Sequence, residues 1–122
     1  MKKLVLFLAL LLPGCAVWDA YTTAHFDNQE YSLVNKVRTI AEHGSCQPIF
    51  VESLYLTTLE LKNYTQYIPH NDKTIDLTNN LFKIVVELRN KSEISPTYCK
   101  AKLNTIGISA EEIQRVVGGK TR

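Results

Sequence analysis

The side chains of this chain that could do acid–base chemistry are three histidines and a set of carboxylates. His25, His43 and His70 each fall at the boundary of a predicted element, where a solvated histidine is the ordinary finding. Glu52 and Glu60 share one predicted helix but stand eight positions apart. That spacing is roughly 12 Å along the helix axis, too far for a catalytic pair. No phosphate-binding glycine loop, GxSxG elbow or HExxH motif occurs. We therefore expect a protein that is not an enzyme and holds no cofactor.

The N-terminal residues have the layout of a secretory signal. Two lysines follow the first methionine, residues 4–12 form an apolar run of nine, and Pro13-Gly14 break the run just before Cys15. Nine residues rise only about 14 Å as a helix, whereas the hydrocarbon core of a bilayer is about 30 Å thick. The pattern therefore predicts an export signal and not a membrane span.

The residues Leu12-Pro13-Gly14-Cys15 resemble the lipobox of bacterial lipoproteins, whose pattern is Leu, a small residue, Gly or Ala, then Cys. Proline at the second place departs from that pattern. The resemblance implies that the Cys15 thiol is joined to diacylglycerol, that cleavage falls just before it, and that the new amine is acylated. Acyl chains at about 0.8 kcal/mol per buried methylene would hold the protein on a membrane. The alternative is an ordinary secretory signal with an incidental cysteine.

The same resemblance divides the chain into a signal peptide (1–14), a lipidated membrane-proximal segment (15–26) and a helical domain (27–122). In enterobacterial lipoproteins an Asp after the cysteine resembles a signal for inner-membrane retention. Ala16 stands there instead, which implies the periplasmic side of the outer membrane. Trp18 and Tyr21 are three and six residues from the lipid site, so they could lie in the interfacial zone of the membrane.

Two cysteines remain once the lipobox has used Cys15. Cys46 and Cys99 are then an even pair in an oxidising compartment, and we predict that they form a disulfide. Chain entropy gives such a bridge, between residues 53 positions apart, about 4 kcal/mol of stabilisation. A metal site with His43 beside Cys46 is the alternative. The chain has no CxxC or HxxxH spacing, so we expect no metal.

The first helix is predicted over 28–43. Asp27 can cap it, Glu30 can reach back in a capping box, and Phe26 and Tyr31 can form a hydrophobic staple. Gly44 supplies a stop.

Capping residues and apolar spacing predict four further helical segments. They run from Pro48 to before Pro69, from near Asp72 through Leu88, from Ser95-Pro96 to Gly107, and from Ser109 through Val117. In the last segment Ser109 and Glu112 form a second capping box, with Ile108 and Ile113 as its staple. No stretch alternates with period two. We therefore expect an all-α fold, a small bundle of three main helices and two short ones with one disulfide.

Charge and tyrosine content bear on the partners. Without the two signal lysines the 14 basic residues become 12, equal to the 12 acidic ones, and a neutral chain is a poor nucleic-acid binder. Tyr55, Tyr64 and Tyr67 lie on or just beyond the second predicted helix, where they either line the edge of the core or form an interface. Acidic residues dominate 15–82 and basic residues dominate 83–122, so packing of these two parts against each other would largely neutralise both. The basic end, Lys120-Thr121-Arg122, could instead touch anionic peptidoglycan or a protein partner.

These patterns predict a non-catalytic, lipid-anchored interaction protein of the cell envelope, on the periplasmic side of the outer membrane. Its partner would be another envelope protein or peptidoglycan. A second hypothesis is a phage or prophage lipoprotein that acts in superinfection exclusion or host lysis. A third is a small enzyme acting on peptidoglycan, which would need a cleft with a carboxylate or histidine of perturbed pKa.

Overall fold

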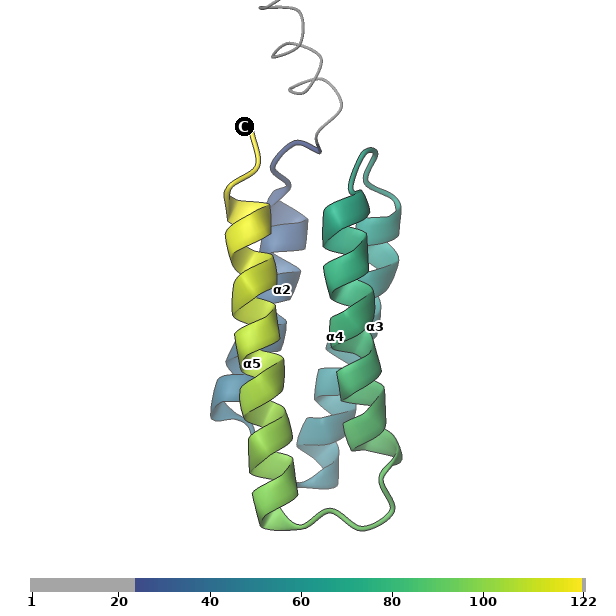
Figure 1. The fold of residues 1–122 in the computed structure, drawn as a ribbon, viewed down its shortest axis with the longest axis vertical. Coiled ribbons are helices and arrows are strands. Elements are labelled where there is room, and N and C mark those ends of the chain that lie inside the picture. Colours follow the sequence, from purple (N-terminus) through teal and green to yellow (C-terminus); the bar gives the residue numbers. More distant parts are fainter. Residues whose placement is uncertain (1–23, 122) are drawn as a thin grey trace, which may run out of the picture.

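The computed structural model describes residues 24–121, which form an antiparallel four-helix bundle (Figure 1). Its helices are α2 (Asn28–His43), α3 (Pro48–Gln66), α4 (Asp72–Asn90) and α5 (Pro96–Gly118). Each helix packs against two neighbours in the order α2, α3, α4, α5, and α5 returns to α2. The α3–α4 turn and both ends of the described chain lie at one end of the bundle, and the other two turns lie at the opposite end (Figure 1). The predicted lipid site Cys15 and the predicted interfacial Trp18 and Tyr21 lie outside the described residues.

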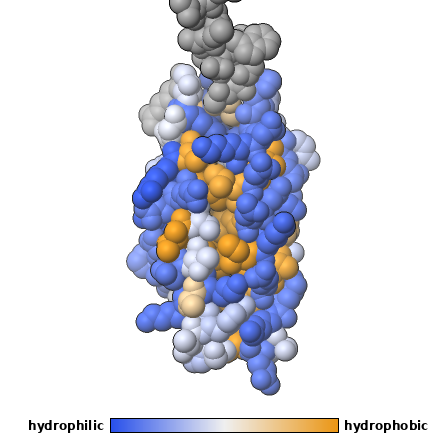
Figure 2. Space-filling model, in the orientation of Figure 1, coloured by the Kyte–Doolittle hydropathy of each residue, from blue (hydrophilic) through white to orange (hydrophobic). Residues whose placement is uncertain are grey.

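The bundle forms because buried positions recur at alternating spacings of three and four, which aligns them as one stripe on a helix. In α5 the stripe is long and mostly apolar, and it consists of Cys99, Leu103, Ile106, Ala110, Ile113 and Val117. In α4 it begins with threonines and consists of Thr74, Thr78, Leu81, Val85 and Leu88. Apolar surface also shows along the centre of the face that α4 and α5 form, between hydrophilic flanks (Figure 2). The predicted all-α bundle is confirmed.

The prediction of two short C-terminal helices is wrong, because α5 runs through Gly107 without a break. Gly107 is buried against α2, where a Cβ atom would lie 3.9 Å from the Ala41 Cβ. A helix-interior glycine costs only about 1 kcal/mol relative to alanine, which packing of the two helices offsets. The predicted second capping box lies in mid-helix, and its staple is not formed, since Ile108 is 60% exposed while Ile113 is buried.

The predicted disulfide is confirmed and ties one end of the bundle. Cys46, in the α2–α3 turn, is bonded to Cys99 in the first turns of α5, with a Cα–Cα distance of 6.0 Å. That separation lies within the usual range for a disulfide. Cys99 is fully buried, so the bridge is part of the core at this end.

The buried stripe of α3 is narrow and partly polar. It consists of Val51, Leu54, Thr58, Leu61 and Thr65. Two of these five positions are threonines, and the large apolar side chain of Phe50 is 42% exposed. Because this stripe is narrow, other large apolar residues of α3 remain on its outer side. Within the described residues, no helix has both the length and the apolar composition needed to cross a bilayer.

Candidate functional site

A buried polar cluster closes the end of the bundle opposite the disulfide. The Lys120 ammonium donates to Glu30 Oε1 and to Asn71 Oδ1, each at 2.5 Å. Asn71 Nδ2 donates to Glu30 Oε2 at 2.7 Å and to the Thr65 carbonyl at 3.0 Å. The Glu30 side chain is fully buried and that of Lys120 is 6% exposed. The cluster therefore joins α2, the end of α3, the start of α4 and the residue that follows the α5 cap.

The capping box predicted for Glu30 is wrong, because both its oxygens accept hydrogen bonds from Lys120 and Asn71. Lys120, from the basic end of the chain, pairs with this acidic residue of the first part, so its side chain lies inside the bundle. Burial of a carboxylate requires a close cation and hydrogen-bond donors, and this requirement overrides the weaker capping bond. No local pattern in the sequence could indicate a pairing between residues 90 positions apart.

The α2 N-terminus is joined to the end of α3 by a second polar contact. The Asp27 carboxylate caps α2 as predicted, since it accepts from the Glu30 N–H at 2.9 Å. The same carboxylate also accepts a hydrogen bond from the Tyr64 hydroxyl, which lies 2.9 and 3.0 Å from its two oxygens. Because ionisation would remove this hydrogen bond to Asp27, the pKa of Tyr64 is raised above its ordinary value of 10.0. The predicted aromatic staple is present, with the rings of Phe26 and Tyr31 centred 5.7 Å apart.

Tyr55 is held in a stack between α3 and α4. Its ring lies 5.7 Å from that of Phe82, and the Arg89 guanidinium lies 4.0 Å from its centroid. The same guanidinium donates to Glu52 at 2.9 Å and lowers the pKa of that carboxyl. Glu52, one of the two glutamates considered for a catalytic pair, is therefore engaged in an ion pair between helices.

The outer side of α3 carries an exposed apolar surface, hereafter the α3 outer face. Ile49 is 72% exposed, Leu56 is 54% exposed and Tyr67, just after the helix, is 87% exposed. A shallow hollow of about 450 Å³ lies between Leu56 and Tyr67 and is also lined by Leu59. Glu60 and Asn63 also line this hollow, so the apolar side chains of the α3 outer face are bordered by polar ones. Exposed apolar surface with a polar rim is typical of a site for protein association.

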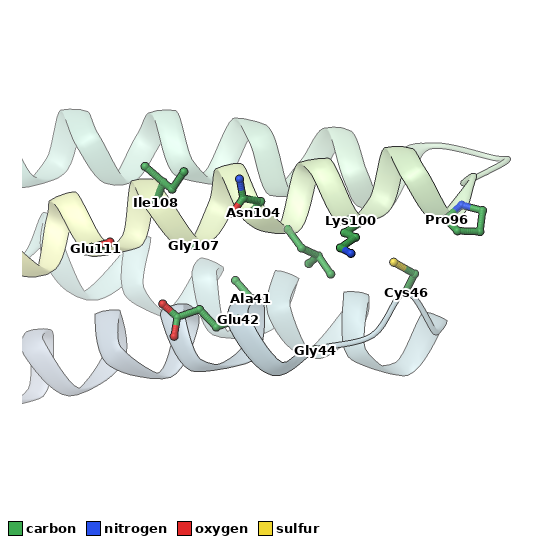
Figure 3. A pocket seen from close by; sticks show the side chains of 11 residues that line it. Ala41, Glu42, Gly44, Cys46, Pro96, Lys100, Asn104, Gly107, Ile108 and Glu111 are labelled. Carbon is green, nitrogen blue, oxygen red and sulfur yellow. The ribbon is translucent and has the colours of Figure 1, made fainter.

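A larger open groove, of about 630 Å³, runs between α2 and α5 near the disulfide (Figure 3). The carboxylates of Glu42 and Glu111 lie toward one end of it, and Lys100 lies nearer Cys46 at the other. Both carboxylates are engaged by arginines one helical turn away on the same helix, at 2.8 and 2.7 Å. The groove is therefore a charged surface hollow whose acidic groups already have partners.

The histidines are divided between the two ends of the bundle. His43 ends α2 as predicted, whereas exposed His25 and His70, which has a φ of 58°, lie at the α3–α4 end. No group of three or more potential metal ligands is assembled within residues 24–121.

Of the three predicted interface tyrosines in the described chain, Tyr55 and Tyr64 have partners within the bundle and Tyr67 is exposed. Comparison with models of known protein families, with curated proteins and with solved structures finds no match for this chain. Its function must therefore be inferred from the geometry of its own residues.

Proposed function

We propose that this chain is a non-catalytic, lipid-anchored interaction protein of the bacterial envelope, held by Cys15 at the periplasmic side of the outer membrane. It presents the α3 outer face to another envelope protein. The observation that carries the proposal is the exposure of Ile49 and Leu56 on one side of a well-packed bundle. Large aliphatic side chains on a helix surface lose contact with water only when a partner covers them.

The rigidity of the bundle supports this role. The Cys46–Cys99 bridge joins helices at one end of the bundle, and the cluster around Glu30 joins them at the other. The helix α3 runs between these two ends and is therefore a firm support for a binding surface. A preformed surface loses little conformational entropy when it binds, which favours affinity. The bridge also fits the oxidising compartment that an exported lipoprotein would enter.

Photocrosslinking tests the binding surface. A photoreactive amino acid at Leu56 should give a crosslinked adduct with one discrete protein in intact cells. The matched control is Asn80, an exposed residue of α4, where the same group should give none. Leu56→Asp should abolish capture of that protein without lowering the melting temperature, because Leu56 is 54% exposed. Adducts of equal yield from both positions, or none from Leu56, would contradict the proposal.

Fatty-acid labelling tests the anchor separately. Cells fed an alkyne-tagged fatty acid should label the chain, and Cys15→Ser should abolish the label and leave an unprocessed or soluble form. Cys46→Ser is the matched control and should keep the label, because its thiol is used in the disulfide. Labelling that survives Cys15→Ser would refute the lipid site.

A further inference from the structure

The described chain starts at the α3–α4 end of the bundle and is fixed there. Ala24 is buried, and its N–H donates to the His70 carbonyl at 3.2 Å, within the α3–α4 turn. Two residues later the Phe26 N–H donates to the Thr121 carbonyl at 2.8 Å. The described chain therefore enters the bundle at this turn, which lies at the same end as Ala24 (Figure 1).

The length of the segment before Ala24 limits how far the turn can lie from a lipid on Cys15. The nine steps from Cys15 to Ala24 span at most about 32 Å when fully extended. The opposite end of the bundle lies roughly 28 Å from this turn, the length of a 19-residue helix such as α3. If the chain is anchored as proposed above, on which this inference rests, the α3–α4 turn is the end nearest to the attachment of the anchor.

The side chains of this turn suit a lipid surface. Tyr67 is 87% exposed and begins the turn directly after α3, while Ile68, which follows it, is half-buried. A tyrosine ring has an apolar body and a polar tip, and it favours the headgroup zone of a bilayer. The exposed Asp72 and Lys73 at the start of α4 offset each other in charge. Contact would therefore depend on the aromatic ring more than on attraction to anionic lipids.

We infer that the α3–α4 turn rests on the lipid surface, with the Tyr67 ring at the level of the headgroups. In this pose α3 runs away from the membrane. Leu56 is eleven positions before Tyr67 in the chain, so it lies about 16 Å farther from the membrane along the helix axis. Tyr67, at one end of the α3 outer face, then contacts lipid, and the protein partner covers the part around Ile49 and Leu56.

Fluorescence quenching tests the inference, because Trp18 is the only tryptophan of the chain. In a Trp18→Phe background, Tyr67→Trp and Leu56→Trp each introduce one indole at an exposed position, and circular dichroism checks that both chains fold. The lipid-modified chains are placed in vesicles of phosphatidylethanolamine and phosphatidylglycerol with or without brominated acyl chains. The Tyr67→Trp indole should shift to the blue and lose most of its emission to brominated lipid, and high salt should not reverse this. The Leu56→Trp indole should keep its emission.

Each other outcome has a distinct meaning. Vesicle-bound, lipid-modified Tyr67→Trp chains whose emission is unaffected by bromine would overturn the inference and leave the anchor intact. Quenching of the Leu56→Trp indole to the same degree would mean that the bundle lies on its side, which also overturns it. A blue shift in native membranes but not in pure lipid would show that a protein covers the turn. Chains that carry no fatty acid would overturn the proposed anchor, and this inference with it.

Discussion

Replacement of Lys120 by methionine should be among the most damaging single changes in this protein. The variant keeps most of the apolar stem of the side chain but removes the ammonium that contacts Glu30 and Asn71. The Glu30 carboxylate, which has no exposed surface, would keep only the Asn71 amide as a side-chain donor. Loss of one partner from a buried ion pair costs roughly 3 to 5 kcal/mol, because the remaining charge has neither water nor a counterion.

The reverse change should cost less. Glu30→Gln leaves a neutral amide that can still bond to Asn71, and the Lys120 stem lies at the end of the bundle, where its ammonium can turn outward to water. We expect a loss of about 1 to 2 kcal/mol for this variant. The double variant has no buried charge, so it should be little less stable than Glu30→Gln alone. The two changes should thus be strongly non-additive, with a coupling of about 2 kcal/mol or more.

Urea unfolding followed by far-UV circular dichroism measures all four chains of this cycle. A Cys15→Ser background carries no lipid and no unpaired thiol, and the disulfide is left intact. The slope of the free energy of unfolding against urea should stay the same, so that midpoints report stability directly. The reasoning is refuted if Lys120→Met costs less than about 1 kcal/mol, or if the two single effects add to within about 0.5 kcal/mol.

Three further predictions concern the bridge, the glycines and one tyrosine. Cys46→Ala with Cys99→Ala should remove about 4 kcal/mol of loop-closure stabilisation and lower the melting temperature by roughly 15 to 30 °C; two free thiols in the mass spectrum of the unreduced chain would refute the bridge. Gly107→Ala should raise the urea midpoint, since the added Cβ would meet its nearest neighbour at an ordinary 3.7 Å, and a lower midpoint would contradict a continuous α5. Gly44→Ala should lower the midpoint, since its Cβ would approach a backbone carbonyl oxygen one turn earlier, and an unchanged midpoint would contradict this close approach. The raised pKa of Tyr64 means that the folded chain holds this proton more tightly than the unfolded chain does. Its contribution to the free energy of unfolding is therefore complete below pH 10.0 and is lost as the pH rises beyond that. An alkaline decline in stability of the same size in Tyr64→Phe would show that another group causes it.

Local signals were enough to predict where α2 begins and ends. Its predicted span is the observed one, Asn28–His43, because Asp27 supplies the cap within three residues and Gly44 follows the last turn. A side chain at Gly44 would collide with the Ile40 carbonyl one turn earlier, so the choice of glycine at this helix end depends on neighbouring backbone alone. The same local grammar was misleading at Gly107, where burial against α2 lets the helix continue.

The disulfide could be predicted because cysteine pairing needs only a count and a compartment. The interface tyrosines could not be sorted in the same way, because each depends on a neighbour distant in sequence. Tyr64 is bound by Asp27, 37 positions away, and Tyr55 lies beneath Arg89 on the next helix. Their residue types suggest half-burial, but only the packing of helices decides which hydroxyl or ring remains available.

The amino-acid sequence by itself determined the helical class, the limits of the first helix and the pairing of Cys46 with Cys99, because periodicity, capping and cysteine number act over short distances or need no geometry. The tertiary structure decided the number of helices, the contacts of Glu30 and Lys120, and the exposure of Tyr67. These properties depend on which helix ends lie together, because a buried charge needs a partner that can be distant in the sequence. The exposure of Tyr67 at the end where the chain enters the bundle is likewise a property of the assembled bundle and not of the residues around it.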